Sequence, residues 1–176
     1  MRLLHMADVH FGKRFLASRF GEEVARRRRQ ALERALMMTV AYANEHDVDH
    51  ILCAGDLIES AEIRPRDLRS LNDIVSGLSR AKIYLACGNH DPLNDTSPYR
   101  RANLSDRLVV LPAGYSRTML DGETALHAFS FPEAELDVNP LASLSMDKTA
   151  RRNLLLLHGD AVTHLDPCSD HALGQG

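Results

Sequence analysis

The chain has 176 residues, of which 44% are apolar, and a formal net charge of −3. This length and apolar content allow one sizeable hydrophobic core, so we expect a single domain over residues 1–176. The small net charge excludes a uniformly basic protein that coats nucleic acid, and no apolar stretch approaches the ~18–20 residues needed to span a bilayer, which argues against a membrane partner.

The first part of the chain alternates strand and helix patterns. A short apolar strand is expected at residues 2–7, followed by an amphipathic helix over 22–45 in which apolar residues recur at helical spacing. A buried strand at 48–54, a second helix at 66–80 and a third strand at 82–87 follow. This order of strands and helices predicts a parallel sheet with right-handed crossovers.

After residue 103 the pattern changes to short strands. Asp121 and Gly122 form a hairpin-turn signal between two of them, so we expect a second, more antiparallel sheet. The elements expected in this half are strands at 108–111, 115–120 and 124–129, a helix at 138–150 and a strand at 153–157.

Polar motifs follow the first two expected strands. Asp8 and His10 alternate with Val9 at a strand end, so their side chains should project in one direction and could hold one metal ion. Gly55 permits a tight turn, and the two carboxylate oxygens of Asp56 could bridge two cations. Taken alone, each motif is equally compatible with a structural role, such as a cap for the next segment.

A more specific motif, Gly88-Asn89-His90-Asp91, follows the third strand. Asn89 offers a neutral carbonyl ligand, His90 can donate or accept a proton near neutral pH, and Asp91 could fix the tautomer of His90. A surface turn would require neither the histidine nor a buried strand that leads into it.

The last motif is His158-Gly159-Asp160, which follows four consecutive leucines. A core strand that ends in this way favours His158 as a metal ligand. Because the carboxyl ends of neighbouring strands meet at one edge of a sheet, we expect the four motifs to form one site.

Basic residues are concentrated between residues 11 and 34, a segment that contains eight Lys or Arg and only three Glu. This excess could meet a phosphate backbone, although a run of arginines also occurs on solvated helix faces. Lys13 and Arg14 are the stronger candidates because they follow the first motif directly. The basic residues are Lys13, Arg14, Arg19, Arg26, Arg27, Arg28, Arg29 and Arg34.

The cysteines, Cys53, Cys87 and Cys168, are odd in number and lack Cys-x-x-Cys spacing. Without a signal peptide, this favours buried thiols and a cytoplasmic location over a disulfide framework.

In order, spacing and strand context, the motifs resemble the calcineurin-like metallophosphoesterase superfamily. Its pattern is Asp-x-His, Gly-Asp, Gly-Asn-His-[Asp/Glu], His-Gly and Gly-His-x-His. Residues 5–12, 88–92, 97–99 and 157–160 look most like the DNA-repair exonuclease branch, the SbcD-type nuclease subunit. The similarity covers the whole chain, as the N-terminal part of that catalytic domain.

This resemblance implies an α/β fold of the α/β/β/α sandwich type, in which two packed mixed sheets are flanked by helices, here truncated at the C-terminus. It implies two divalent ions, with Mn²⁺ suited to mixed oxygen and imidazole ligands. His90 would be the catalytic histidine, oriented by Asp91. The implied metal ligands are Asp8 and His10 for the first ion, Asp56 between the two, and Asn89 and His158 for the second.

One block of the family pattern is missing, since no Gly-His-x-His follows His158. His164 or His171 could replace these ligands, but we interpret the sequence as a fragment or a truncated form. Three functions remain open: a Mn²⁺-dependent nuclease for double-stranded DNA ends, a phosphoesterase for small phosphorylated substrates, and a non-catalytic metal-binding or interaction module. For the nuclease, the resemblance implies an SMC-like ATPase partner and a homodimer.

Overall fold

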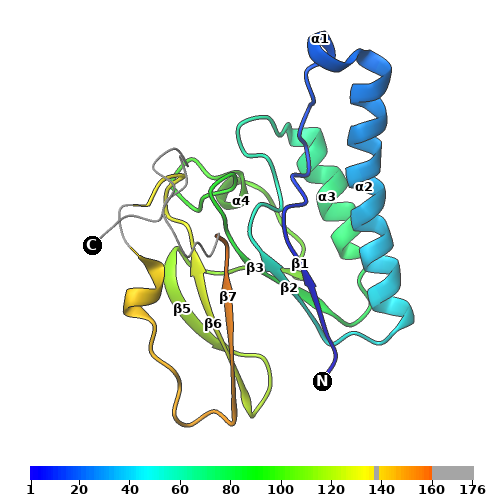
Figure 1. Cartoon of the computed structure of the whole chain (residues 1–176). Coiled ribbons are helices and arrows are strands. Elements are labelled where there is room, and N and C mark those ends of the chain that lie inside the picture. The colour runs from blue at the N-terminus through cyan, green and yellow to red at the C-terminus, as the bar shows by residue number, and fades with distance from the viewer. Residues whose placement is uncertain (137–138, 160–176) are drawn as a thin grey trace.

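The first sheet contains four parallel strands in the order β1-β2-β3-β4. In the computed structural model, which describes residues 1–136 and 139–159, this sheet lies between two helices and a second sheet (Figure 1). The parallel sheet predicted from the alternating pattern is therefore confirmed, but the strand expected at 108–111 belongs to this sheet and not to the second one, because it pairs with β3 in parallel. Its strands are β1 (Leu3–Met6), β2 (His50–Ala54), β3 (Lys82–Ala86) and β4 (Leu108–Val110).

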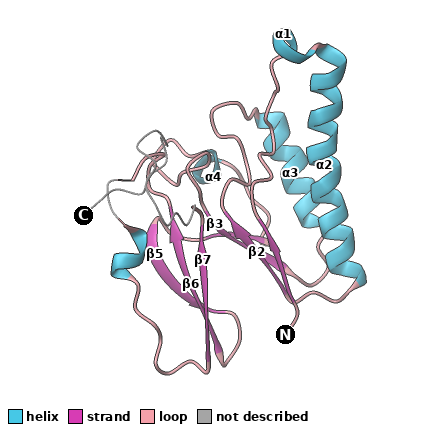
Figure 2. Cartoon of the chain, viewed as in Figure 1, coloured by secondary structure: helices cyan, strands magenta, loops and turns pink. Residues whose placement is uncertain are grey.

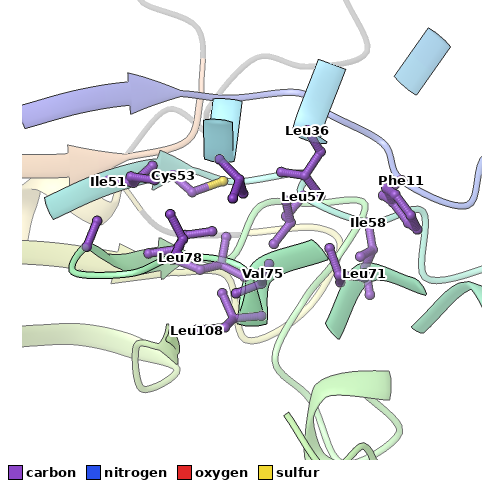
Figure 3. Packing of buried hydrophobic residues seen from close by; sticks show 14 of the residues in the cluster. Phe11, Leu36, Ile51, Cys53, Leu57, Ile58, Leu71, Val75, Leu78 and Leu108 are labelled. Atoms are coloured by element: carbon purple, nitrogen blue, oxygen red, sulfur yellow. The ribbon is translucent and has the colours of Figure 1, made fainter. Parts of the chain in front are cut away.

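Two long helices form the crossovers and cover one face of this sheet (Figure 2). Helix α2 (Glu22–Glu45) has the bounds expected from its pattern, and α3 (Pro65–Ser76) begins with a proline, whose fixed φ suits the first helical turn. Because side chains alternate along a strand, Ile51 and Cys53 of β2 pack against Leu36 of α2 in the core between helices and sheet (Figure 3).

The second sheet has three strands in the order β5-β6-β7. Strands β5 (Gly114–Met119) and β6 (Thr124–Ser130) form the expected antiparallel hairpin, and β7 (Arg152–Leu157) pairs with β6 in parallel. Leu52 and Ala54, on the other face of β2, pack with Leu126 and Leu156 in a second core between the sheets. The expected arrangement of two packed sheets with flanking helices is confirmed.

The prediction of a helix over residues 138–150 is wrong. The described part of this segment holds only a 3₁₀ turn, η1 (Pro140–Ser143). The Asn139 side chain accepts a hydrogen bond from the Leu141 N–H, and the Asp147 side chain accepts one from the Thr149 N–H. Such local bonds compete with helical ones. Two short helices, α1 (Ala17–Phe20) and α4 (Pro98–Arg101), were not anticipated.

Cys53 and Cys87 are buried free thiols, as expected, and burial raises the pKa of both. Among the described helices, none is long and apolar enough to cross a membrane. The remaining cysteine, Cys168, and the candidate ligands His164 and His171 lie outside the described residues.

Candidate metal centre

The loops that follow β1 and β2 lie side by side and carry three of the candidate ligands. Asp8, His10 and Asp56 all have a positive φ, of 56°, 47° and 55°, which is uncommon for residues other than glycine. Hydrogen bonds hold this strained backbone, because the Asp8 N–H donates to the Gly55 carbonyl at 3.2 Å and the His10 N–H donates to the Asp56 carbonyl at 2.8 Å.

The expectation that Asp8 and His10 project together as alternating strand residues is wrong. Strand β1 ends at Met6, and the left-handed backbone of both residues breaks the alternation. Asp8 instead lies with Asp56 and His158, whereas His10 belongs to a neighbouring group.

Asp56 is the central side chain of the site and is only 2% exposed. Its Oδ1 accepts a hydrogen bond from the His90 N–H at 3.0 Å. Its Oδ2 lies 3.7 Å from His10 Nε2 and 3.5 Å from His158 Nε2. One oxygen therefore anchors the loop of His90, and the other lies between two imidazoles from opposite ends of the chain.

His158 approaches Asp56 from the end of β7 in the second sheet. Its Nδ1 lies 2.9 Å from the Ala54 carbonyl, which can only accept, so this nitrogen carries a proton. Its Nε2 lies 3.0 Å from Asn89 Oδ1 and 3.5 Å from the Asp56 carboxylate. When the His158 ring is neutral, its Nε2, Asn89 Oδ1 and the Asp56 carboxylate are three acceptors that face one another. A cation stabilises such an arrangement.

Two glycines leave the space that His158 occupies. A Cβ at Gly55, whose φ is +81°, would lie 2.6 Å from His158 Cβ, and a Cβ at Gly88 would lie 2.9 Å from the His158 ring. Both distances are shorter than real Cβ contacts. A side chain at Gly55 would therefore displace the imidazole, and one at Gly88 would displace both the imidazole and the Asp56 carboxylate, whose Oδ1 would lie closer still.

A second group of candidate ligands consists of His10, Glu59 and His90. Glu59 is 7% exposed, and its Oε1 lies 2.9 Å from His90 Nδ1. Its Oε2 lies 3.3 Å from both His10 Nδ1 and Lys13 Nζ. Burial alone would raise the pKa of Glu59, but the hydrogen bond with His90 and the charges of His90 and Lys13 outweigh it and lower the pKa.

The sequence patterns did not single out Glu59. The available signal was its position in the Gly-Asp loop, three residues after Asp56. A carboxylate there is close enough to Asp56 to share its site, but the contacts with His10 and His90 depend on how three loops meet.

Asp91 does not orient His90 through a hydrogen bond, so that expectation is corrected. Its Oδ1 accepts from the Asp56 and Gly88 N–H groups at 3.0 and 2.7 Å, and its Oδ2 accepts from the Leu57 N–H and the Tyr99 hydroxyl at 2.9 and 2.8 Å. Both oxygens are engaged in joining the two loops. The contact with the His90 ring belongs to Glu59.

The donor set fits divalent cations. Each of the two groups offers ligand atoms that all lie within 4.8 Å of one another, and carboxylates mixed with imidazoles suit first-row divalent metals. Within the described residues, His10 Nδ1 and Glu59 Oε2 are buried without a hydrogen-bond partner, because their 3.3 Å approach lacks hydrogen-bond geometry.

Beside this centre, an arginine-lined groove has a volume of about 210 Å³. It lies between the loop after His10 and helices α2 and α3. Its lining includes Arg14, Arg29, Arg64 and Arg66, together with the carboxylates of Glu33 and Asp67. The Arg29 guanidinium donates to the Arg14 carbonyl at 2.6 Å, which holds the helix against the loop. The groove carries an excess of positive charge.

Carboxylate, imidazole and amide side chains that meet at the carboxyl ends of strands from two packed sheets are typical of metal-dependent hydrolases. The profile of the calcineurin-like phosphoesterase family matches residues 1–171, and the chain belongs to this family.

Two curated proteins are similar to the chain over 167 residues. Both are described as DNA double-strand break repair protein Mre11, one from Methanosarcina acetivorans at 27% identity and one from Methanosarcina mazei at 26%. Each match covers 90% of this chain and 25% of the relative. The chain thus spans about a quarter of the length of these relatives, and the resemblance to the DNA-repair branch is confirmed.

Proposed function

We propose that this chain is a metal-dependent phosphodiesterase that cleaves DNA, as the nuclease core of a break-repair protein. The observation that carries the proposal is the Asp56 carboxylate, which lies between His10 and His158 and is tied to the backbone of His90. A buried carboxylate between two imidazoles, next to a partly exposed histidine, suits two-metal hydrolysis.

The proposed cofactor is a pair of divalent ions, most suitably Mn²⁺. Its proposed ligands are Asp8, His10, Asp56, Asn89 and His158, with Asp56 shared between the ions. Bound there, divalent cations would supply Lewis-acid polarisation of the phosphoryl oxygens. The protein contributes ligands whose positions are fixed beforehand, since the Ala54 carbonyl sets the tautomer of His158 and the His90 N–H orients Asp56.

His90 is the proposed general acid. The Glu59 carboxylate accepts the Nδ1–H of His90, so Nε2 lies on the side of the ring away from Glu59. The His90 side chain is 41% exposed, in contrast to the buried Glu59 that holds it. Nε2 can therefore reach a substrate in solvent and donate a proton to the oxygen that leaves. In this scheme Asp91 is a positioning residue, because it holds the loop and makes no hydrogen bond to the ring.

The arginine-lined groove favours DNA over a small phosphorylated substrate. It lies between the loop after His10, one turn of α2 and the start of α3, so its guanidinium groups could contact more than one phosphate of a strand. A small phosphate ester occupies only the metal centre and would gain nothing from Arg64 or Arg66. Both relatives are described as DNA double-strand break repair proteins, which agrees with this preference.

Further parts of the proposal rest on the family resemblance: double-stranded DNA ends as the substrate, an SMC-like ATPase as a partner, and a homodimer. A cytoplasmic location is proposed from the cysteine pattern, and one domain over residues 1–176 from the length and apolar content of the chain.

The test combines Mn²⁺ binding with cleavage of linear double-stranded DNA. His90→Ala should reduce cleavage by about 10²- to 10⁴-fold, the usual contribution of a general acid, and leave Mn²⁺ affinity unchanged. Asp56→Ala should lose Mn²⁺ binding. His46→Ala, at an exposed histidine that stacks on Tyr42, is the matched control and should match the parent.

Four results would contradict the proposal in different ways. Parental cleavage by His90→Ala would remove the catalytic assignment. Hydrolysis of p-nitrophenyl phosphate without cleavage of DNA, or DNA cleavage that does not weaken with salt, would favour a small-molecule phosphoesterase. If the chain neither binds Mn²⁺ nor hydrolyses either substrate, the function that remains is that of a non-catalytic module.

A further inference from the structure

His10, Glu59 and His90 form a group of candidate ligands that the proposed pair of ions does not account for. One ligand atom from each side chain lies within 4.8 Å of the others. Glu59 joins the two histidines, because its Oε1 lies 2.9 Å from His90 Nδ1 and its Oε2 lies 3.3 Å from His10 Nδ1. The group therefore has a carboxylate of its own, which the proposed ligands of the ion pair do not include.

Two of the facing atoms in this group lack a hydrogen-bond partner. Among the described residues, His10 Nδ1 and Glu59 Oε2 are buried and make no hydrogen bond, and Glu59 is only 7% exposed. Buried polar atoms normally find partners. These two atoms face each other rather than an open cavity, and a metal ion binds between ligand atoms that face each other. The unused atoms therefore indicate a cation rather than a larger ligand.

The spacing of these atoms suits a tetrahedral ion. Ligands at roughly 2.0–2.2 Å from a tetrahedral Zn²⁺ lie roughly 3.3–3.6 Å from each other. His10 Nδ1 and Glu59 Oε2 already have this separation, at 3.3 Å, and the 2.9 Å between Glu59 Oε1 and His90 Nδ1 must widen only slightly. The His90 side chain is 41% exposed, so an ion can enter the group from solvent past this ring.

The donor set distinguishes this ion from the proposed pair. Two imidazoles with one carboxylate are a common protein ligand set for Zn²⁺, whose fourth position stays open. The carboxylate and amide oxygens of Asp8, Asp56 and Asn89 instead suit a harder ion such as Mn²⁺. Because a given set of ligands binds Zn²⁺ more tightly than Mn²⁺, the imidazole-rich group should take up zinc.

We propose that His10, Glu59 and His90 form an inhibitory zinc site. Zn²⁺ on His90 Nδ1 leaves the only ring proton on Nε2, and this neutral ligand would have to become an imidazolate to give that proton away. His90 could then not act as a general acid. His10 bound through Nδ1 carries its proton on Nε2, the nitrogen that lies 3.7 Å from the Asp56 carboxylate, and is lost to the catalytic pair. The inhibition, but not the zinc binding, rests on the proposed function.

Lys13 would oppose zinc at this site. Its Nζ lies 3.3 Å from Glu59 Oε2, so an ammonium group already neutralises the oxygen that the ion would use. The Lys13 side chain is 37% exposed and can swing into solvent when zinc binds. Removing this charge should therefore strengthen zinc binding, whereas it would weaken the binding of an anionic substrate.

The test is calorimetric titration of metal-free protein with Zn²⁺, in a chain that carries Asp56→Asn. Asparagine keeps an oxygen that can accept the His90 N–H and removes the charge shared by the catalytic ions. This variant should bind one Zn²⁺ per chain and no Mn²⁺. Adding Glu59→Gln should weaken zinc binding by more than the roughly 10- to 100-fold that the loss of an outer contact costs. Adding Lys13→Ala should strengthen it about 1.5- to 5-fold, the usual strength of a partly exposed ion pair.

His158→Ala is the matched control, because its ring belongs to the other group of candidate ligands, with Asp8 and Asp56. Added to Asp56→Asn, it should leave zinc affinity unchanged. If it weakens zinc binding as much as Glu59→Gln does, zinc lies in that other group and the proposal is overturned. The proposal also fails if Asp56→Asn takes up no Zn²⁺.

Inhibition is measured separately, as Mn²⁺-dependent cleavage of linear double-stranded DNA with added Zn²⁺. Cleavage by the parent should fall as zinc fills the site. The residual cleavage by Glu59→Gln, taken relative to its own rate without zinc, should be much less sensitive. Equal sensitivity would mean that zinc only replaces Mn²⁺, and the inhibitory role would be wrong.

The two proposals fail in distinguishable ways. Zinc binding by Asp56→Asn, together with no DNA cleavage by the parent, would remove the proposed function and leave the zinc site. DNA cleavage by the parent without zinc binding by Asp56→Asn would remove the inhibitory site alone.

Discussion

Removing the Tyr99 hydroxyl tests whether Asp91 joins the two loops of the metal centre. Tyr99 is 5% exposed and donates to Asp91 Oδ2 at 2.8 Å. Tyr99→Phe keeps the ring and removes one hydrogen bond to a charged group, which costs about 1.5–3 kcal/mol. For a chain of this length, that loss should lower Tm by roughly 3–12 °C. Three backbone N–H groups still bind Asp91, so the variant should fold.

The size of this effect should depend on pH. Burial raises the pKa of Asp91, the Gly88 N–H and the Tyr99 hydroxyl lower it in part, and the charge of Asp56 raises it. Because the folded pKa lies above the unfolded value, ionised Asp91 costs stability as the pH rises through the folded pKa. Tyr99→Phe raises that pKa further and enlarges the cost at neutral pH. Once Asp91 is protonated, the lost bond is worth only about 0.5–1.5 kcal/mol.

The assay is denaturant unfolding of metal-free protein at neutral pH and near pH ~4, close to the ordinary Asp pKa. Tyr84→Phe is the control, because Tyr84 lies in β3 and its ring contacts His50 rather than Asp91. The reasoning is refuted if the two variants lose equal stability, or if the loss in Tyr99→Phe does not shrink in acid.

Gly55→Ala should push the His158 ring away and weaken Mn²⁺ binding about 10- to 100-fold, the usual effect of disturbing the support of a ligand, as calorimetric titration would measure. Gly122→Ala, where a Cβ meets nothing within 4 Å, should bind like the parent, and equal affinities would contradict the close-approach argument. Glu59→Gln should lower the free energy of unfolding at neutral pH. Since the folded pKa of Glu59 is lowered, its stabilisation is present above the unfolded pKa and is lost as the pH falls through the folded pKa. The deficit of the variant should therefore disappear in acid, and denaturant unfolding at several pH values that shows a constant deficit would exclude a charge effect.

Hydrophobic periodicity made most of the fold predictable. Alternation along β2 separates Ile51 and Cys53 from Leu52 and Ala54, and these two sets face different cores. Helix α2 was predicted at its observed bounds because its apolar residues recur at helical spacing over many turns. The segment over 138–150 has no such dominant pattern, so local side-chain bonds decide its structure.

The candidate ligands were predictable only as residue types at strand ends. Their grouping depends on the backbone, since positive φ values at Asp8 and His10 direct the two side chains into different groups. The contact between Glu59 and His90 joins two loops that are 31 residues apart in sequence. The role of Asp91 depends on hydrogen bonds from backbone N–H groups. Every residue except proline carries such a group, so a sequence pattern cannot predict these contacts.

The position of His158 has a consequence for synthesis of the chain. This imidazole follows β7, while Asp8, Asp56 and Asn89 belong to loops made more than 60 residues earlier; its contacts with Asn89 and Ala54 span 69 and 104 residues. During translation the parallel first sheet can form before β7 leaves the ribosome, since domains fold as their segments emerge. The proposed ligands made earlier would then lie close together before His158 joins them. A nascent chain that carries them would therefore lack one of the proposed metal ligands until its second sheet has docked.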